Sequence, residues 1–473
     1  MSRLAEEFLV AAAQKSADLT HRATIKRNID SYDAAVAKGK MRFVDWEAAR
    51  ARAAQVKSEG MHSLGPLLES FEAKIKARGG HVYWAENSED ARQYICDVAK
   101  KHDVKTVVKS KSMVTEEIHL SPALEKLGIK VWETDLGELI VQLRNEPPYH
   151  IVTPAMHLTR EQIRDLFLEK MPSDVQGETH QELVAAARRF LRRAFFSAEM
   201  GISGANFLVA DAGMVAISTN EGNGRLTTSL PKIHVVVTGI EKVIPRLEDL
   251  GVMWPVLATT GTGQPITTYS TLIGGPKTAD EVDGPEEFHV VLVDNGRTEV
   301  LADKAQQELL RCIRCGACLN QCPVYRQVGG HTYKSTYPGP IGSALMPIFQ
   351  GQQDYGHLSY ACSLCTACNS VCPVKIKLSD HLLENRHKYV AEGNAKTSEK
   401  IGFSFFRWMA MNRSRYEFFG WAGRKALRVA LGMGVKPEQL GPLAKWTKYR
   451  AVPEVPKESF RALWKKENGN GNR

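Results

Sequence analysis

Two copies of one cysteine pattern constrain this chain more than any other feature of its sequence. Eight of the nine cysteines lie in the runs Cys312–Pro323 and Cys362–Pro373, and each run reads C-x2-C-x2-C-x3-C-P. This is the spacing of bacterial ferredoxins, in which three thiolates bind one [4Fe–4S] cluster and the fourth cysteine binds the other. The proline stops the loop from continuing as a regular helix. A fold that holds two such clusters must bring the two runs together.

The crossed arrangement assigns every thiolate of the two runs to one of two [4Fe–4S] clusters. The expected ligands of the first cluster are Cys312, Cys315, Cys318 and Cys372. The expected ligands of the second cluster are Cys362, Cys365, Cys368 and Cys322. Each iron then has a thiolate, so the pattern predicts one-electron transfer and no bond chemistry at the clusters.

Other uses of the cysteines fit the sequence less well. Disulfides need an oxidising compartment, and the first residues, with two acids ahead of the short apolar run Phe8–Ala13, are not typical of a signal peptide. Structural zinc usually shows paired C-x2-C knuckles without a third cysteine at the same step. The ninth cysteine, Cys96, lies in a helical pattern and is interpreted as a packing residue.

Length and composition indicate a multidomain globular protein. A chain of 473 residues is long enough for two or three domains. A hydrophobic share of 43% with 24% charged residues excludes a disordered or fibrous chain. No apolar stretch reaches the roughly eighteen residues that a membrane-spanning helix needs. We therefore expect a cytoplasmic protein, with contact at the inner face of the membrane as a further option.

The basic charge of the chain is confined to its C-terminal part. Residues 391–473 carry 17 basic and 7 acidic residues, a balance of +10, so the rest of the chain contributes −1 to the overall +9. Aromatic residues interleave with these charges. They are Phe403, Phe405, Phe406, Trp408, Phe418, Phe419, Trp421, Trp446 and Trp464. Such helices bind anionic lipid or an acidic partner, or fold back over the clusters. Docking to a partner protein is preferred, and no nucleic acid is expected because no binding module accompanies the charge.

The region from about Gly80 to Leu301 alternates short β-rich runs with helical patterns, which predicts an α/β sheet covered on its faces. The predicted strands include His81–Trp84, Thr106–Val108, Ile129–Trp132, Asn206–Val209, Met214–Ile217, His234–Val237 and His289–Val293. The region before the sheet is predicted to be helical, with docking points at Phe8, Ile25, Ile29 and Trp46.

Three polar runs of the α/β region are candidate ligand sites, and neither a dinucleotide fingerprint nor a P-loop is present. The candidate ligand-binding residues are Lys109, Lys111, Ser112, Glu133, Asp135, Glu221, Asn223 and Arg225. The first five follow predicted strands, where α/β proteins bind ligands. Plainer interpretations stay open: a solvated loop for the lysines, a helix cap for the acids, and a hairpin turn for Asn223-Gly224. His150 and His157 are interpreted as structural histidines.

The order of these parts resembles the lactate-utilisation iron–sulfur protein B family of bacteria, over nearly the whole chain. The resemblance rests on the twin cysteine runs together with Val108–Met113, Glu133–Glu138, Asn220–Arg225 and Leu230–Lys232. It implies a lactate-utilisation (LUD) domain, similar in fold to sugar isomerases and CoA transferases, followed by a helical dicluster ferredoxin. It also implies an electron-carrying role in a three-protein complex that oxidises L-lactate to pyruvate. The implied partners are a cysteine-rich CCG-type subunit and a second LUD subunit.

Together these observations predict four parts: a helical region over 1–75, the α/β domain over 76–301, the dicluster domain over 302–392 and a basic helical region over 393–473. The first functional hypothesis is an electron-transfer subunit of an L-lactate-oxidising complex. The second is an α/β enzyme of the acyl- or sugar-transfer type with an accessory redox module. A cluster-bearing regulator that binds nucleic acid is a third.

Overall fold

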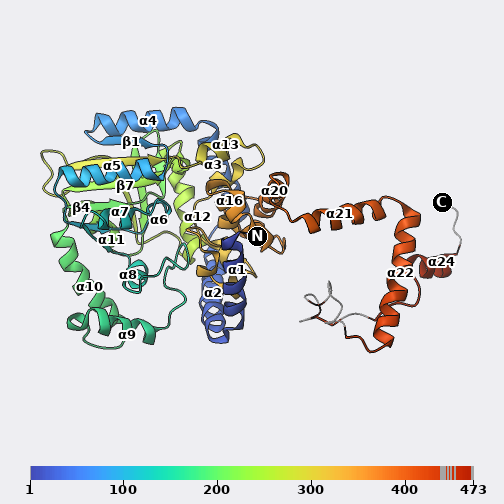
Figure 1. Cartoon of the computed structure of the whole chain (residues 1–473). Coiled ribbons are helices and arrows are strands. Elements are labelled where there is room, and N and C mark those ends of the chain that lie inside the picture. The colour runs from blue at the N-terminus through green and yellow to red at the C-terminus, as the bar shows by residue number, and fades with distance from the viewer. Residues whose placement is uncertain (1, 437–443, 445–446, 448–449, 452–453, 470–473) are drawn as a thin grey trace. The chain divides into compact units, whose positions relative to one another are not determined.

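The structure is a computed structural model that describes residues 2–436, 444, 447, 450–451 and 454–469 (Figure 1). The chain divides into two compact units, Met1–Glu392 and Gly393–Arg473. The first unit contains the α/β sheets, the N-terminal helices and both cysteine runs. The second unit contains the basic region, and each unit is described separately below.

Four helices precede the first strand, as the sequence predicts. They are α1 (Arg3–Ala17), α2 (Leu19–Lys40), α3 (Trp46–His62) and α4 (Leu64–Ala77). Asp18 and Asp45 cap α2 and α3 by accepting hydrogen bonds from backbone N–H groups of the first turn. The expected docking residues Phe8, Ile25 and Ile29 are buried in the main hydrophobic core, and Trp46 packs against it.

The centre of the first unit is a six-stranded parallel sheet with the order β1-β10-β7-β4-β2-β3. Its strands are β1 (His81–Ala85), β2 (Thr106–Lys109), β3 (Lys130–Glu133), β4 (Met200–Ser203), β7 (Ile233–Gly239) and β10 (Glu287–Val293). Five of these strands were predicted. The sixth, β4, was missed because its four residues, with a central glycine, lack the β-branched pattern of a strand.

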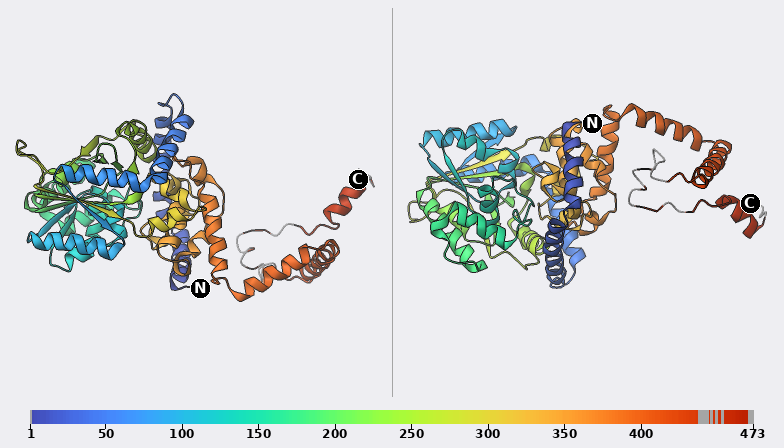
Figure 2. Two further views of the ribbon diagram at one scale, coloured as in Figure 1. Left: turned by 90° about the horizontal axis from the view of Figure 1, so that it is seen from above. Right: turned by 60° about the horizontal axis from the view of Figure 1, so that its bottom comes forward.

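Both faces of this sheet are covered by helices (Figure 2). Along β7, Val235 and Val237 pack into one core with α5 (Ser88–Lys101), whereas Val236 packs into the core on the other face. This alternation follows from the two-residue period of a strand. The predicted α/β class with a covered sheet is confirmed, and Cys96 is buried in α5 as a packing residue.

A second sheet of four strands has the order β8-β5-β6-β9. The strands are β5 (Phe207–Val209), β6 (Met214–Thr219), β8 (Val243–Ile244) and β9 (Tyr269–Ile273). After β6 the chain enters helix α11 (Asn223–Ser229), so the hairpin interpretation of Asn223-Gly224 is wrong. The Asn-Gly pair begins a helix, because β6 pairs with β5 and β9 and not with the segment that follows it.

The cysteine runs lie among short helices that the N-terminal helices contact. The main elements are α13 (Arg297–Ala302), α14 (Ala317–Gln321), α15 (Tyr325–Val328), α16 (Gly339–Phe349), α17 (Gln352–Tyr355), α18 (His357–Tyr360), α19 (Ala367–Val371) and α20 (Leu378–Ala391). Helix α14 packs against α19, and α16 packs against α20. Helix α1 contacts α15 and α17, so the two ends of the first unit share one core.

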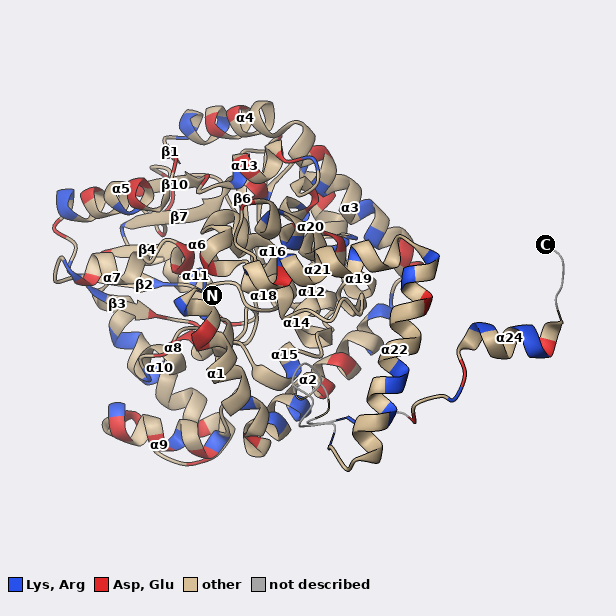
Figure 3. Ribbon diagram, turned by 45° about the vertical axis from the view of Figure 1, so that its right-hand side comes forward, with Lys and Arg blue, Asp and Glu red and all other residues tan. Residues whose placement is uncertain are grey.

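The second unit is helical in its described part, with α21 (Thr397–Ala410), α22 (Arg413–Gly432) and α24 (Phe460–Asn468). Basic residues recur along α22 (Figure 3). The predicted aromatic residues Phe405, Trp408 and Trp464 are exposed, whereas Trp446 lies outside the described residues. None of the helices in the described part of the chain combines the length and apolarity that crossing a bilayer requires.

A buried arginine links the sheet elements to the cysteine region. The Arg297 guanidinium is fully buried and donates two hydrogen bonds of 2.8 Å to the Glu117 carboxylate and one of 2.6 Å to Glu241. The Tyr337 hydroxyl donates to the same Glu117 carboxylate over 2.6 Å. Burial alone would lower the pKa of Arg297, but both glutamates raise it. Removing the arginine would leave the buried carboxylates of Glu117 and Glu241 without their counter-charge.

We therefore expect Arg297→Leu to lower the free energy of unfolding by about 3–5 kcal/mol, because Glu117 and Glu241 lose their buried counter-charge. The measurement is chemical denaturation followed by circular dichroism under anaerobic conditions. The control is Arg164→Leu, since Arg164 pairs with Asp165 and Glu178 at the surface and its loss should change little. Equal effects of the two substitutions would contradict a special role for Arg297.

Candidate functional site

The two cysteine runs adopt the same local backbone. The residue immediately before the second cysteine has a positive φ in both copies, 59° at Arg314 and 55° at Leu364. The residue after the second cysteine does so as well, 76° at Gly316 and 63° at Thr366. A non-glycine residue with positive φ is uncommon and costs energy. Its occurrence at equivalent positions shows that both runs wrap the chain in one specific way.

Backbone N–H groups point at the cysteine sulfurs in both runs. The N–H two residues further along donates to the Sγ of Cys312 (3.4 Å) and of Cys362 (3.2 Å). N–H groups three or four residues further along donate to Cys322 (3.5 Å) and Cys372 (3.3 Å). Hydrogen bonds of this kind stabilise thiolates and are one of the factors that set cluster potentials.

The electrostatic neighbours of the cysteines come from both runs. Burial raises the pKa of Cys315, and the neighbouring Cys312 and Cys372 raise it further. Burial likewise raises the pKa of Cys322, and there the contributing neighbours are Cys362 and Cys365. The last cysteine of each run thus lies with the first cysteines of the other run.

The two groups of thiols are adjacent but differ in exposure. Burial and the charges of Cys362 and Cys322 raise the pKa of Cys368 to about 12, while Cys368 also contributes to the raised pKa of Cys318 in the other group. Cys365 is exposed. All nine cysteines lie in the described part of the chain, and none of them forms a disulfide there.

Buried positive charge accompanies the group that contains Cys312. Burial lowers the pKa of Lys57 to about 7 and that of Lys242 to about 8, and Cys312 opposes the shift in both cases. Arg314 has a raised pKa although it is buried, with Cys312 as the strongest of the groups that raise it. Thiolates with buried cations and N–H donors around them match the donor set of an anionic iron–sulfur cluster.

A cavity of about 870 Å³ lies at the carboxyl ends of the parallel strands. Its walls include the segment 110–114 after β2, 135–137 after β3, 204–206 after β4, and Lys242 after β7. The remaining wall includes Cys315 and its neighbours 313–314 from the first cysteine run. The ligand-binding edge of the α/β sheet and a cysteine of the ferredoxin-like run therefore face the same space.

The structure brings five of the eight candidate ligand residues together in this cavity. They are Lys111, Ser112, Asp135, Glu221 and Asn223. Asp135 also caps α8 (Leu136–Leu143), accepting from backbone N–H groups of Gly137 (3.1 Å) and Glu138 (3.3 Å), as the cap interpretation expects. Partial burial and then the Asp135 carboxylate raise the pKa of Glu221 above its ordinary value.

The other three candidates do not line the cavity. Lys109 is fully buried, and its ammonium donates to Glu133 (2.6 Å) and Glu116 (3.0 Å). Burial would lower the pKa of Lys109, but these carboxylates raise it well above its usual range. Arg225 is exposed and lies over the Tyr269 ring at 5.4 Å. Lys109 and Glu133 therefore form a charge pair inside the fold.

Sequence reasoning missed three residues of the cavity wall, Lys242, Arg314 and Tyr337. They lie far apart in the chain and carry no local motif, although Arg314 is inside the first cysteine run. His150 and His157, which were interpreted as structural, are both partnered. His150 Nδ1 accepts from the Val152 N–H (3.0 Å), and His157 Nε2 lies 3.0 Å from Glu146.

Comparison with protein families divides the chain into three matched regions. Residues 68–293 match the LUD domain, residues 308–376 match a 4Fe-4S dicluster domain, and residues 384–469 match the C-terminal domain of lactate utilisation protein B. The match at residues 308–376 covers both cysteine runs, so these eight cysteines belong to an iron–sulfur domain.

Related proteins match the chain over most of its length. Lactate utilization protein B of Bacillus subtilis (strain 168) is 46% identical over 424 residues, which is 88% of this chain and 87% of the relative. The corresponding protein of Anoxybacillus flavithermus is 44% identical over 432 residues, 90% of each chain. The uncharacterized electron transport protein YkgF of Escherichia coli (strain K12) is 44% identical over 421 residues, 89% of this chain and 88% of the relative.

One solved structure, a DUF162 family protein from Deinococcus radiodurans, covers 49% of this chain and 98% of its own, with 13% identity and a TM-score of 0.29. That overlap is too low to support an argument. The identity to the full-length relatives and the three matched regions do support one. They show that the chain belongs to the lactate utilization protein B family.

Proposed function

We propose that this protein is the iron–sulfur electron-transfer subunit of a multi-subunit complex that oxidises L-lactate to pyruvate. The observation that carries the proposal is the position of the cysteine groups. The group with Cys315 faces the cavity of the α/β sheet, and the group with Cys365 reaches the surface. The names of the relatives, lactate utilization protein B and electron transport protein, agree with both halves of the proposal.

In this proposal the chain holds two [4Fe–4S] clusters with crossed ligands. Cys312, Cys315 and Cys318 hold one cluster together with Cys372, and Cys322 completes the cluster of the second run. When bound, such clusters supply one-electron redox chemistry. The chain's own contribution is to orient eight thiolates, donate N–H groups to four of them and surround Cys312 with buried cations.

The order of exposure favours a direction of electron flow. An electron entering at the cavity meets the group with Cys315 first, and the exposed Cys365 marks the exit toward a partner. Lys111, Ser112, Asp135, Glu221 and Asn223 are proposed to bind the ligand of the cavity. Lys109 and Glu133 are proposed to hold the neighbouring strand ends in place, since their charges pair with each other.

The partners are proposed to be a cysteine-rich subunit and a second LUD subunit, with the complex in the cytoplasm or at the inner face of the membrane. Exposed aromatic and basic residues of α21 and α22 supply a surface suited to a partner protein. A transfer enzyme of the acyl or sugar type is the second candidate, because the cavity opens at the carboxyl ends of the parallel strands and contains the acids Asp135 and Glu221.

The crossed ligand scheme predicts which pairs of cysteine substitutions act on one cluster. Cys322→Ala combined with Cys362→Ala should retain about four iron atoms per chain, because both ligands belong to the same cluster. Cys322→Ala combined with Cys312→Ala should lose nearly all iron. The measurement is iron and acid-labile sulfide content after anaerobic purification. The opposite pattern would refute the crossing and leave an uncrossed arrangement.

The functional proposal predicts that L-lactate reduces the clusters of the full chain only when the partner proteins are present. The expected readout is bleaching of the cluster absorbance and a reduced-cluster signal in electron paramagnetic resonance. The same mixture with Cys312→Ala and Cys362→Ala substituted together, which lacks both clusters, serves as the control. Turnover of a CoA ester by this cluster-free variant, without any lactate-dependent reduction in the intact protein, would favour the transfer enzyme.

A further inference from the structure

Lys242 is a buried lysine that lines the cavity, with the charges of Glu241 and Cys312 nearby but no direct hydrogen bond to either. It ends the short helix η2 (Ile240–Lys242), which follows β7 directly, and only 6% of its surface is exposed. In the described part of the chain, no oxygen lies within hydrogen-bonding or ion-pair distance of its Nζ. An unpaired buried charge is costly. Burial, and then repulsion from Arg314, lowers the pKa of Lys242 to about 8.

Arg314 is a second cation in the same wall whose hydrogen-bond donors are not all satisfied. Its Nη2 lies 3.5 Å from the Glu241 carboxylate, and its guanidinium lies over the Tyr337 ring at 4.6 Å. Its Nη1 is buried and has no acceptor among the described residues. Both Lys242 and Arg314 line the cavity beside Cys315. The two side chains therefore offer free N–H donors and positive charge at one place.

The cavity wall combines basic and acidic side chains. The charged residues that line it are Lys111, Asp135, Glu221, Lys242 and Arg314. Arg314 also pairs with Glu241, which is not part of the lining. A phosphate group with two charges would be repelled by Asp135 and Glu221. A small carboxylate brings only one charge and can accept hydrogen bonds from Lys242 and Arg314.

We propose that Lys242 and Arg314 hold the carboxylate of a small hydroxy acid or oxo acid in this cavity, next to Cys315. The proposal deepens the proposed function and rests on it for the placement of the ligand beside a cluster. Asp135, Glu221 and Asn223 remain available to the other polar groups of the acid. Binding alone is proposed, with no transfer of electrons or protons assigned to these side chains.

A competing explanation is that the buried cations only balance the charge of the cluster thiolates. Lys57 separates the two explanations. It is fully buried, its ammonium donates to the Glu241 carbonyl oxygen, and it interacts with Cys312 as Lys242 does. Unlike Lys242, it does not line the cavity. Removing either lysine should change the charge near the cluster, but only Lys242 should matter for the ligand.

The test is isothermal titration of the full-length, cluster-loaded protein with pyruvate, L-lactate or inorganic phosphate under anaerobic conditions. We expect the wild-type protein to bind one of the two acids more tightly than phosphate. Lys242→Met should weaken binding of that acid by about tenfold or more, since a charge-assisted hydrogen bond is lost. Lys57→Met should leave the affinity within about twofold of wild type, while both variants shift the potential of a cluster in redox titrations.

Three results would overturn the proposal: no binding of either acid by the wild-type protein at millimolar concentration, tighter binding of phosphate, or equal weakening by the two methionine variants. Iron content checks that each variant is loaded. If Lys242→Met loses iron, Lys242→Gln replaces it, because glutamine keeps a donor without the charge. In a further outcome, L-lactate and the partner proteins still reduce the clusters although this chain binds neither acid measurably. That result would refute the present proposal and leave the proposed function intact.

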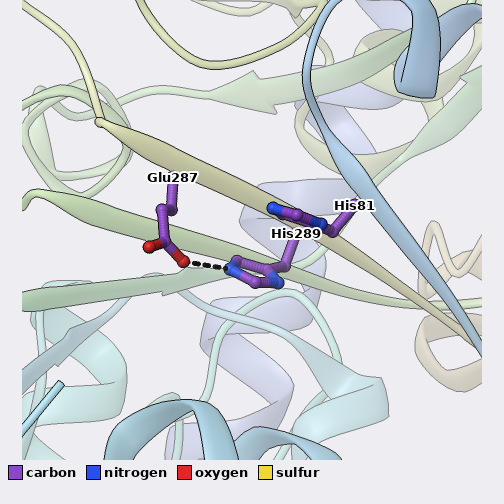
Figure 4. A group of neighbouring side chains, drawn as sticks. All are labelled: His81, Glu287 and His289. Carbon is purple, nitrogen blue, oxygen red and sulfur yellow. Dashed lines mark hydrogen bonds and ion pairs between the residues drawn. The ribbon is translucent and has the colours of Figure 1, made fainter. Parts of the chain in front are cut away.

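A second inference concerns the opposite end of the sheet, where His81, Glu287 and His289 meet (Figure 4). His81 begins β1 and lies beside His289 in the register of β1 and β10. Glu287 lies two residues before His289, and the two side chains are on the same face of β10. The three ligand atoms, one from each residue, lie within 4.8 Å of one another. Two residues at i and i+2 with a third on the neighbouring strand form a compact three-ligand set.

The rings of His81 and His289 stack with their centroids 4.7 Å apart, and further neighbours hold His289 and Glu287. The Tyr94 hydroxyl lies 2.9 Å from His289 Nδ1, which leaves Nε2, 3.2 Å from the Glu287 carboxylate, on the side of the other two ligands. A partner on the second ring nitrogen is the usual way to fix a ligating histidine. Burial, as the main effect, lowers the pKa of His289 to about 4, so the imidazole is neutral. His102 lies 3.1 Å from Glu287 and adds a further nitrogen nearby.

The geometry points to a site for a divalent transition metal of the zinc type, held by His81, Glu287 and His289. Two imidazole nitrogens and one carboxylate are a common zinc ligand set, with water at the open position. The site lies at the amino ends of β1 and β10, whereas the cavity lies at the carboxyl ends of the strands. A metal there would fasten β1, which is an edge strand, to its neighbour.

The test is dialysis of untagged, cluster-loaded protein against micromolar zinc sulfate, followed by zinc and iron analysis. We expect one zinc per chain in the wild-type protein and a loss of at least about tenfold in affinity for His81→Ala and for Glu287→Gln. His81 is exposed, so its substitution should not disturb folding. His180→Ala, at an exposed histidine of α10 (His180–Ser197), is the matched control. Zinc retention that ignores His81 and Glu287 at constant iron content would refute the site.

Discussion

The first unit of this protein depends on how it accommodates negative charge in its interior. Eight cysteines in two adjacent groups lie in a 4Fe-4S dicluster domain, and thiolates are stable inside a protein only when donors and cations surround them. The fold meets this demand in two ways. Backbone N–H groups point at four of the sulfurs, and Lys57, Lys242 and Arg314 lie near Cys312. These cations come from helix α3, from the short helix that follows β7 and from the cysteine run itself, so the α/β domain takes part in building the cysteine site.

This shared construction explains why the cysteine region is not an independent module. Arg297 and Tyr337 meet on the buried carboxylate of Glu117, which belongs to the α/β sheet elements. The N-terminal helices contact both regions, since α3 packs against β8 and α1 packs against α15. Cutting the chain between sheet and cysteines would break the Tyr337–Glu117 hydrogen bond and the Arg314–Glu241 ion pair. The cavity between the two regions is therefore bounded by both of them, with Cys315 in its wall.

The parts of this architecture that follow local rules could be predicted from the sequence. The cysteine spacing indicated an iron–sulfur domain, and the β-rich runs placed most strands of the parallel sheet within one or two residues. The residues after β2 and β3 were placed at a ligand site because carboxyl ends of parallel strands share an edge. Lys242 and Arg314 could not be placed there, since their meeting depends on packing between segments distant in the chain. The role of Asn223 in a helix was missed for a related reason: its Asn-Gly pair also suits a turn.

Distance along the chain also explains why Lys109 does not line the cavity. A lysine at a strand end is ordinarily a free cation, and its sequence context alone indicates an anion site. In the fold, the ammonium of Lys109 pairs with two carboxylates, Glu133 from β3 and Glu116 from α6 (Met113–Glu117). These ion pairs occupy the ammonium, so it is not available to a ligand. Lys242 is the opposite case: its segment carries no motif, yet packing places it in the wall of the cavity without a hydrogen-bond acceptor among the described residues. Which lysine is available to a ligand is therefore decided by tertiary packing. Lys242 lines the cavity together with Cys315, so charge from a ligand and charge from a cluster would act on the same ammonium group.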